Sequence, residues 1–516
     1  MQTQGFTFMK DKIAIKYLFQ KGNYIANVSD RLYGSFVEHL GRAVYTGIYE
    51  PDHPNADEHG FREDVAAMIK ELNISTVRYP GGNFVSGYNW RDGIGPKEKR
   101  PTRLDYAWLT KETNEFGIDE FATWAEKYGL SPMIAVNLGT GTPQDAGYFI
   151  EYCNLKSGTT LSDERIKNGR TNPYNFKLWC LGNEMDGPWQ TCHLEAQEYA
   201  RKAHETAKIM RWVDPAIELV GCGSATTNLP SYPEWDRVVL EGLYDDIDYL
   251  SCHHYFENST GNTQDFLASY VKMDDFINTI KSTANYVKAK LRSKKDMMIS
   301  FDEYNIWSIE GEPWMDYFKD PSHRFTKAPP LLEQHYTFLD SLVFSGLMCT
   351  LVNNCDRVKM ASLAQLVNVI APIYTKPNGE AIKQTIFYPF ELFSNYARGV
   401  ALNYFANVPM IETVHGQTKT LQSCAVYNEE KKQIAFFVLN LNETNATPIS
   451  FVLDGFGTVA LKGGIELEGY NLNAKNTFET PNAVTPKAIT LTQAQKDSLS
   501  VEIKPLSFAM YLLDVE

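Results

Sequence analysis

The sequence has no long apolar run and no excess of basic residues. No stretch approaches the ~18 consecutive apolar residues that a membrane-spanning helix requires, so we expect no membrane partner. The 49 Lys and Arg residues are outnumbered by 63 Asp and Glu residues, which gives a formal charge of −14. A protein that neutralises phosphates needs a basic surface, and the most basic run, KEKRPTR at 97–103, is typical of a solvated loop. We therefore expect no nucleic-acid partner.

Paired cysteines and clustered histidines are also missing. The eight cysteines include no C-x-x-C pair, and several lie inside apolar segments, which is typical of buried thiols in a reducing compartment. No secretory signal is visible because Lys10, Asp11, Lys12 and Lys16 interrupt the apolar runs at the N-terminus. The close histidine pair at 253 and 254 falls on an expected strand, where neighbours point to opposite faces. The sequence predicts a cytoplasmic protein without a metal site or cofactor.

From residue 33 onward, short apolar segments alternate with segments of helical periodicity, which is the pattern of an α/β fold. Each apolar segment ends in polar residues, as expected for strands that are buried on both faces and open into solvent at one end. Eight such units predict a (β/α)8 TIM barrel. The expected strands are 33–39, 75–81, 131–137, 177–184, 218–223, 248–255, 297–304 and 348–353. The expected helices are 61–72, 118–129, 193–212, 265–292 and 331–346.

The pattern changes after about residue 385, where strand-like segments are separated by polar turns. Only 492–499 has helical character there, which predicts a C-terminal all-β sandwich of jelly-roll type. The segment 11–30 also has strand character and precedes the first barrel strand, so we expect it to pair into the same sandwich. The predicted domains are a catalytic barrel at 28–385 and a sandwich formed by 1–27 together with 386–516.

Functional residues of a TIM barrel lie at the C-terminal ends of its strands. Those ends carry three carboxylates, an arginine and several amides, which is an unusual set for a packed rim. The residues at these ends are Glu38, Arg78, Asn137, Asn183, Glu184, His253, Tyr255, Glu303, Asn353 and Asn354.

Glu184 and Glu303 end the fourth and seventh expected strands and should face each other across the barrel. Glycoside hydrolysis requires such a pair, one carboxyl group to protonate the leaving oxygen and one ionised carboxylate beside the sugar. The alternative for either residue alone is a solvated or lysine-paired glutamate, but both are flanked by amides and aromatics. Asn183 suits a hydrogen bond to a sugar 2-hydroxyl group. Arg78 would hold a carboxylate ionised, or else form a salt bridge on the rim.

Loop residues complete the expected pocket. The turn at Pro80-Gly81-Gly82 would present Asn83, and aromatic faces are suitable walls for the C–H surface of a sugar. Core packing is the ordinary role for any single tryptophan, and Trp108 and Trp307 are the preferred pocket walls.

Five motifs carry a family resemblance: GSFVEHLGRAVYTGIYEP, VRYPGGNFVSGYNWRDGIGP, WCLGNEMDGPWQ, FDEYNIW and LAQLVNVIAPIYT. Through them the chain resembles, essentially end to end, the α-L-arabinofuranosidases of glycoside hydrolase family 51. The resemblance implies a retaining, exo-acting hydrolase of arabino-oligosaccharides that needs no cofactor and assembles as a homo-oligomer, a hexamer. It implies that Glu184 is the acid/base, that Glu303 is the nucleophile and that Arg78 supports Glu303. The implied sugar-binding residues are Glu38, Asn83, Asn183, Tyr255 and Gln365.

Two residues depart from the family pattern, since Trp is more usual where Tyr304 stands and Gln where His254 stands. These departures affect at most the shape of the subsites. Two alternatives remain open, a barrel glycosidase that acts on another pentoside or on β-glucan, and a carbohydrate-binding protein without activity. The presence of both Glu184 and Glu303 argues against the second.

Overall fold

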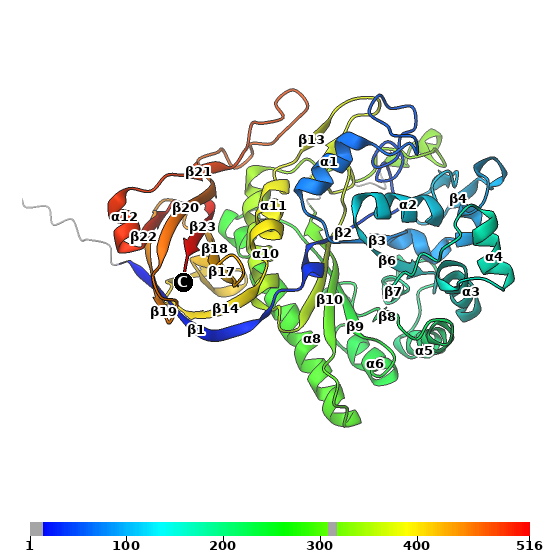
Figure 1. Cartoon of the computed structure of the whole chain (residues 1–516), viewed down its shortest axis with the longest axis horizontal. Coiled ribbons are helices and arrows are strands. Elements are labelled where there is room, and N and C mark those ends of the chain that lie inside the picture. The colour runs from blue at the N-terminus through cyan, green and yellow to red at the C-terminus, as the bar shows by residue number, and fades with distance from the viewer. Residues whose placement is uncertain (1–13, 308–316) are drawn as a thin grey trace, which may run out of the picture.

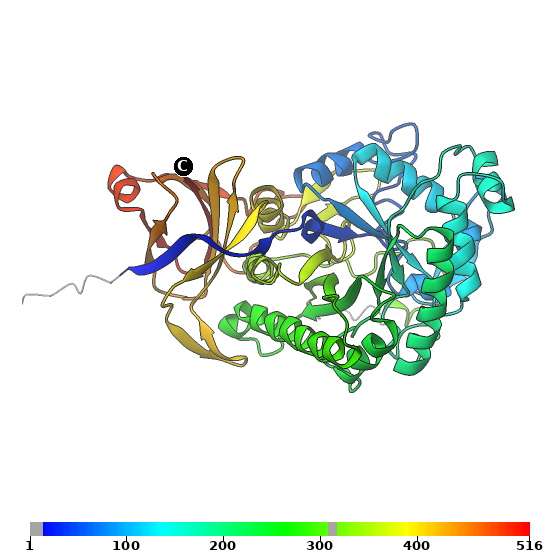
Figure 2. The ribbon, with the colours of Figure 1, turned by 60° about the horizontal axis from the view of Figure 1, so that its bottom comes forward.

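The computed structural model describes residues 14–307 and 317–516, which form a barrel and a β-sheet domain (Figure 1). Figure 2 shows the blue strand β1 leading from the sheet domain towards the barrel. No helix in these two ranges is long and apolar enough to cross a membrane.

The barrel is a closed ring of eight parallel strands, which confirms the predicted fold. Successive strands along the chain are neighbours in the ring, and the last strand pairs with the first. Each strand is buried almost throughout, as the apolar segments indicate. The strands are β2 (Gly34–Phe36), β3 (Thr76–Tyr79), β6 (Ser131–Val136), β7 (Leu178–Leu181), β8 (Glu218–Gly221), β9 (Tyr249–Phe256), β10 (Met298–Ile306) and β11 (Val358–Leu363).

Helices cover the outside of the ring, and their ends follow local sequence signals. For example, Thr142 accepts a hydrogen bond from the backbone N–H of Asp145 at the start of α3, where Pro143 takes the first helical position. Gly129 ends α2 in the left-handed conformation, with φ of 69°. The α-helices described within residues 14–307 are α1 (Glu63–Glu71), α2 (Ile118–Tyr128), α3 (Pro143–Asn154), α4 (Thr160–Lys167), α5 (Ala196–Val213), α6 (Glu234–Leu243), α7 (Thr263–Leu267) and α8 (Ser269–Leu291).

The prediction of the eighth strand at 348–353 is wrong. These residues form the second half of α10 (Phe338–Asn353), and the eighth strand is β11. Helix α10 lies between the barrel and the sheet domain and contacts β10 on one side and β17 and β18 on the other (Figure 1). Because it is buried on almost every side, it lacks the polar face that reveals a helix in a sequence, and MCTLVN therefore has the pattern of a strand.

The second domain is one nine-stranded mixed sheet in the order β21-β20-β23-β18-β17-β14-β1-β19-β22. Strand β1 pairs with β14 in antiparallel and with β19 in parallel orientation, so the N-terminal strand belongs to this sheet as predicted. The sheet curls around an apolar core that includes Tyr17, Phe436 and Phe451. Its strands are β1 (Ile15–Asn27), β14 (Val400–Phe405), β17 (Leu421–Asn428), β18 (Gln433–Asn440), β19 (Thr447–Asp454), β20 (Ala460–Leu467), β21 (Lys487–Ile489), β22 (Ser500–Ile503) and β23 (Ser507–Asp514).

Two helices and three hairpins complete the described chain. The predicted helical segment 492–499 forms α12 (Gln493–Ser498), whereas α11 (Phe387–Tyr396) lies in a segment expected to be all β. Like α10, α11 is mostly buried, and Phe393 stacks on Phe437 of β18 at 4.2 Å between ring centroids. The hairpins are β4 (Arg103–Asp105) with β5 (Thr110–Glu112), β12 (Ile373–Thr375) with β13 (Ala381–Lys383), and β15 (Met410–Thr413) with β16 (Gly416–Lys419).

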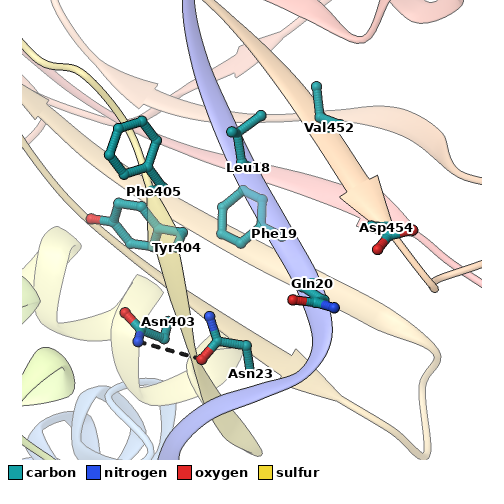
Figure 3. Close-up of a pocket in the computed structure, with 9 residues that line it drawn as sticks. All are labelled: Leu18, Phe19, Gln20, Asn23, Asn403, Tyr404, Phe405, Val452 and Asp454. Atoms are coloured by element: carbon teal, nitrogen blue, oxygen red, sulfur yellow. Dashed lines mark hydrogen bonds between the residues drawn. The ribbon is translucent and has the colours of Figure 1, made fainter.

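A shallow hollow of about 530 Å³ lies on the sheet domain, over β1, β14 and β19 (Figure 3). Leu18 is paired in register with Phe405 on one side and with Val452 on the other, so three exposed apolar side chains form a row across the sheet. Asn403 donates a hydrogen bond to Asn23 at 3.4 Å along the same face. The hollow shares no residue with the predicted sugar site.

Candidate active site

Glu184 and Glu303 meet at the C-terminal mouth of the barrel. Glu184 follows β7, Glu303 lies in the second half of β10, and both side chains are almost buried. One carboxylate oxygen of each lies within 4.8 Å of the other and of a ring nitrogen of His253. The structure thus brings together the two carboxylates that the strand pattern predicts on one pocket.

The backbone after β7 turns sharply to place Glu184. Gly182 and Glu184 both have positive φ, 89° and 43°, and the second value is unusual for a residue with a side chain. The carbonyl of Glu184 accepts a hydrogen bond from the backbone N–H of Gly187 at 2.8 Å, which closes the turn. The indole N–H of Trp189 then donates to Oε2 of Glu184 at 2.6 Å. This turn fixes both the backbone and one carboxylate oxygen of Glu184.

Glu303 is held by two donors. Arg78 on β3 donates from Nη1 to Oε2 at 3.0 Å, and the hydroxyl group of Tyr255 donates to Oε1 at 2.7 Å. Burial raises the pKa of Glu303, and the neighbouring Glu184 adds to this effect, whereas His253, Arg78 and Tyr255 act in the opposite direction. Each of these three groups stabilises the ionised carboxylate.

Arg78 joins several groups of the site. Its guanidinium donates to Oδ1 of Asn183 as well as to Glu303, and its Nε lies 3.5 Å from Asp302. Burial opposes the ionisation of Arg78, but the charges of Asp302 and Glu303 outweigh it and raise its pKa. A permanently charged, forked side chain thus fixes the orientations of Asn183 and Glu303 together.

His253 lies between the two catalytic candidates. Its Nδ1 is 2.9 Å from Oε1 of Glu184 and 3.4 Å from Oε2 of Glu303, while its Nε2 is 3.5 Å from Asp302. Although burial opposes protonation, Glu303, Asp302 and Glu184 raise the pKa of His253 to about 10. The hydroxyl group of Ser251 holds Asp302 through a 2.6 Å hydrogen bond. His253 is therefore an imidazolium that links the carboxylates.

Glu184, His253 and Glu303 are the one group of three His, Cys, Asp or Glu side chains in the described part of the chain with the spacing of metal ligands. A histidine must lose its proton to bind a metal ion, and the carboxylates around His253 raise its pKa and so oppose that loss. The donor set therefore fits proton chemistry better than metal binding.

Glu38 is the centre of a second polar group in the mouth. Its Oε1 accepts hydrogen bonds from the backbone N–H of Phe84 and the indole of Trp108, both at 2.9 Å, and its Oε2 accepts one from Gln365 at 3.3 Å. Burial raises the pKa of Glu38 to about 8, and the charge of Glu303 contributes, although the bond from Phe84 opposes the shift. A Cβ atom at Gly82 would lie 2.2 Å from Oε2 of Glu38. The glycine turn therefore lets the backbone approach this carboxyl group.

Two further predicted residues border the site. Asn83 begins the 3-10 helix Asn83–Gly87, next to Phe84, and its side chain is half-buried. Trp307 packs edge-on against Tyr255 with ring centroids 5.1 Å apart. Tyr255 therefore has its hydroxyl group on Glu303 and its ring against Trp307.

Two of the amides at the expected strand ends lie elsewhere, and a third stabilises its own loop. Asn137 accepts hydrogen bonds from the backbone N–H groups of Gly139 and Gly141 and so stabilises its own loop. Asn353 and Asn354 end α10 instead of a strand, and they bond to Ser423 and Asp274. Asn137 follows the C-terminal end of β6 as predicted, whereas the positions expected for Asn353 and Asn354 are wrong because they followed from the wrong eighth strand.

The two departures from the family pattern point away from the carboxylates. Tyr304 is buried, stacks on Phe344 of α10 and donates to the sulfur of Met348. The ring of His254 packs against Phe256, on the opposite face of β9 from His253. Tyr304 therefore shapes the contact with α10 and not the mouth.

The linking roles of His253 and Asp302 and the contact of Trp189 with Glu184 were not predicted from the sequence. The sequence predicts His253 at the correct strand end, but its partners come from two other strands, Glu184 after β7 and Asp302 and Glu303 on β10. Trp189 was not predicted as a site residue, because core packing is the ordinary role of a single tryptophan. Its position five residues after Glu184, in a turn-forming segment, was the available signal.

Comparisons with known proteins agree with this geometry. Residues 68–281 match the family model described as the alpha-L-arabinofuranosidase 1 domain, and residues 302–507 match the alpha-L-arabinofuranosidase C-terminal domain. The chain is 48% identical over 455 residues to an intracellular exo-alpha-(1->5)-L-arabinofuranosidase of Acetivibrio thermocellus, covering 88% of this chain and 90% of the relative. It is 46% identical over 497 residues to an exo-alpha-(1->6)-L-arabinofuranosidase of Bifidobacterium longum, covering 94% of each.

A solved structure extends the similarity to the whole architecture. A family 51 alpha-L-arabinofuranosidase from Bifidobacterium longum superposes with a TM-score of 0.91 at 39% identity, over 96% of this chain and 99% of that one. The two family models, the relatives and this structure cover both the barrel and the sheet domain. The chain therefore belongs to the α-L-arabinofuranosidases of glycoside hydrolase family 51 and is a glycosidase.

Proposed function

We propose that the protein is a retaining, exo-acting α-L-arabinofuranosidase that removes terminal non-reducing α-L-arabinofuranosyl residues from arabino-oligosaccharides. The observation that carries the proposal is the approach of Glu184 and Glu303 to within 4.8 Å between oxygens. Retaining glycosidases have carboxyl groups ~5–5.5 Å apart, whereas inverting enzymes need ~6.5–9.5 Å to accommodate a water molecule. The short separation supports direct attack by one carboxylate on the sugar.

Glu303 is the nucleophile of this proposal. Its donors, Arg78 and Tyr255, favour the ionised form, which is the form that attacks the anomeric carbon. Attack forms a bond between a Glu303 oxygen and the anomeric carbon while the glycosidic bond breaks. The product of this first step is a covalent glycosyl-enzyme and a leaving group that requires a proton.

Glu184 is the acid/base. It donates its proton to the departing glycosidic oxygen in the first step and removes a proton from the attacking water in the second. Trp189 fixes one of its oxygens and leaves the other towards His253 and the centre of the site. Two displacements at the anomeric carbon restore the original configuration.

The remaining residues hold the sugar. Glu38 and Gln365 are linked to each other and offer a carboxyl group and an amide, which suit sugar hydroxyl groups. Asn183, orientated by Arg78, is suited to the 2-hydroxyl group. Asn83 adds a further amide. Trp108 and Trp307 provide the aromatic walls of the pocket.

The relatives indicate linkage and compartment. One is named for (1->5) linkages and another for (1->6) linkages, and the first is named as intracellular. We propose that this chain acts in the cytoplasm on short oligosaccharides with one of these linkages. Hydrolysis of linear (1->5)-linked arabinotriose and of an α-L-arabinofuranosyl-(1->6)-hexoside at equal concentration distinguishes them, because a (1->6) linkage requires a hexose as the acceptor.

We further propose that the chain associates with copies of itself into a homo-oligomer. By family resemblance this homo-oligomer is a hexamer. The row of Leu18, Phe405 and Val452 on the sheet supports it, since Phe405 is 67% exposed and apolar rows of this kind favour contact with another protein surface. Light scattering coupled to size-exclusion chromatography measures the mass of the assembly. A monomer at micromolar concentration would contradict the proposed self-association.

Proton NMR of the first-formed sugar tests the central proposal. We expect 4-nitrophenyl α-L-arabinofuranoside to be cleaved with release of the α-anomer before mutarotation. Release of the β-anomer would show inversion, and preferential cleavage of the corresponding xylopyranoside would identify a different pentosidase. Binding of arabino-oligosaccharides without any turnover would indicate the carbohydrate-binding alternative.

A further inference from the structure

Gln190 is a buried amide beside the active site that no step of the proposed reaction uses. It lies in the segment that follows Glu184, and its side chain is 3% exposed. Its backbone N–H donates to the carbonyl of Gly187 at 2.9 Å, and its carbonyl accepts from the N–H of His193 at 3.1 Å. These bonds hold the backbone of the turn whatever side chain stands at this position. The amide of Gln190 therefore serves other contacts.

This amide joins Asn183 to Ser86. Its Oε1 accepts a hydrogen bond from Nδ2 of Asn183 at 3.4 Å, and its Nε2 donates to Oγ of Ser86 at 2.5 Å. Asn183 and Ser86 are buried as well. Ser86 lies on the 3-10 helix that begins at Asn83. The chain of hydrogen bonds thus crosses from the segment after β7 to the segment after β3.

Arg78 sets the direction of every bond in this chain. A guanidinium has donors only, so the atom of Asn183 that faces Arg78 must be its oxygen. Nδ2 of Asn183 then points to Gln190, which must present its own oxygen and keeps its Nε2 for Ser86. The hydroxyl group of Ser86 donates in turn to the sulfur of Met185 at 3.8 Å. Both ends of the Asn183 amide are therefore held, one by a cation and the other by Gln190.

Close packing keeps Ser86 beside the segment that carries Gln190. A Cβ atom at Gly139 would lie 2.5 Å from the carbonyl oxygen of Ser86 and 2.5 Å from that of Thr191. The backbone N–H and the hydroxyl group of Thr140 donate to the same oxygen of Ser86 at 2.9 and 3.1 Å. The loop after β6 therefore fixes the separation between the two ends of the bond from Gln190 to Ser86.

We propose that Gln190 is a positioning residue of the reaction, which orients the amide of Asn183 towards the 2-hydroxyl group of the arabinofuranosyl residue. The inference rests on the proposed function, in which Asn183 binds that hydroxyl group. Hydrogen bonds to the 2-hydroxyl group of a glycoside strengthen in the transition state, so an amide that can turn loses part of this stabilisation. Ser86 supports Gln190 in this role.

The test compares a substrate that has the 2-hydroxyl group with one that lacks it. We measure kcat/KM for 4-nitrophenyl α-L-arabinofuranoside and for its 2-deoxy analogue, after subtraction of spontaneous hydrolysis, and take the ratio of the two values. Gln190→Met keeps the length of the side chain and removes its amide. Loss of the positioned hydrogen bond should lower the ratio about tenfold, mainly through kcat on the substrate with the 2-hydroxyl group.

Two further variants locate the effect at Asn183. In an Asn183→Ala background, Gln190→Met should leave the ratio where Asn183→Ala alone puts it, because the amide that Gln190 orients is gone. Ser86→Ala removes a single hydroxyl group and keeps the bond between Gln190 and Asn183. It should lower the ratio by a smaller factor than Gln190→Met.

Gln384→Met is the matched control. Gln384 is also buried, and its amide bonds to the backbone of Gln334, Tyr336 and Ala371 instead of to a side chain of the site. The same chemical change at this position should leave the ratio at the wild-type value, even where it lowers stability.

The outcomes separate the positioning role from the function. An unchanged ratio in Gln190→Met would overturn the inference, both where the two activities fall together and where neither falls. A further fall of the ratio on adding Gln190→Met to Asn183→Ala would do the same. Where Gln190→Met does not fold, an unchanged ratio in Ser86→Ala overturns it. A wild-type protein that does not cleave 4-nitrophenyl α-L-arabinofuranoside would overturn the proposed function itself, and this inference with it.

Discussion

Replacing Tyr255 with Phe removes one hydrogen bond to Glu303 and little else. The lost bond is the 2.7 Å donation from the phenol to Oε1, while the ring that packs against Trp307 at 5.1 Å is retained. A hydrogen bond to a charged group contributes roughly 1.5–3 kcal/mol. Since the donor favours the ionised carboxylate, its loss should raise the pKa of Glu303.

The sign of the effect on activity follows from the role of Glu303. The nucleophile must be ionised, so activity falls as the pH drops through its pKa, and a higher pKa moves this loss to higher pH. The acidic limb is the fall of kcat/KM at low pH. For 4-nitrophenyl α-L-arabinofuranoside its position reports the pKa of the nucleophile in the free enzyme. In Tyr255→Phe we expect this limb to shift to higher pH.

Tyr304→Phe is the matched control for this experiment. Tyr304 immediately follows Glu303, but its hydroxyl group contacts the sulfur of Met348 and no carboxylate. The same chemical change at this position should leave the acidic limb in place. An unmoved or downward-shifted limb in Tyr255→Phe, or an equal shift in both variants, would refute the reasoning.

Three further predictions follow from the contacts of the site and of α10. With an activated aryl arabinofuranoside, the Glu184→Ala enzyme should still form the glycosyl-enzyme at a measurable rate. Azide should restore its turnover and give an arabinofuranosyl azide with the anomeric configuration of the substrate. Glu303→Ala should lose activity by several orders of magnitude. A retained azide adduct from Glu303→Ala would reverse the two roles. Gly82→Ala places a Cβ atom against Glu38 and should lower kcat/KM about tenfold or more, and full activity would show that this carboxyl group is free to move. Phe344→Ala removes a fully buried ring from α10 and should lower the free energy of unfolding by about 3–5 kcal/mol, measured with guanidinium chloride, whereas a loss below about 1 kcal/mol would contradict the packing described.

Seven of the eight barrel strands could be predicted from the sequence because each is an apolar segment with a polar end. The eighth could not, since α10 continues beyond the expected helix 331–346 and its last residues, 348–353, are apolar on nearly all sides and have the pattern of a strand. An amphipathic sequence pattern identifies helices and strands that have one side facing solvent. An element buried between two domains has no such side.

The residues of the site also include some that could be predicted from the strand pattern and some that could not. Glu184 and Glu303 could be predicted because both follow from strand ends, but Gln365 was expected only by resemblance, since it follows β11, the strand that the pattern misplaced. The linking position of His253 depends on Asp302 from the neighbouring strand β10 and on Glu184 from β7, two strands away, and such distances become visible only in the folded barrel.

The position of α10 determines whether the barrel and the sheet domain can be separated from each other. Phe344 and Leu347 of α10 belong to the same continuous apolar cluster as Phe437 and Phe508 of the sheet domain, and the barrel strands contribute to it as well. A cut between barrel and sheet would expose this shared surface on both pieces. The chain should therefore melt in a single calorimetric transition, and recombination of its barrel with an unrelated accessory domain would remove part of the barrel's own interior.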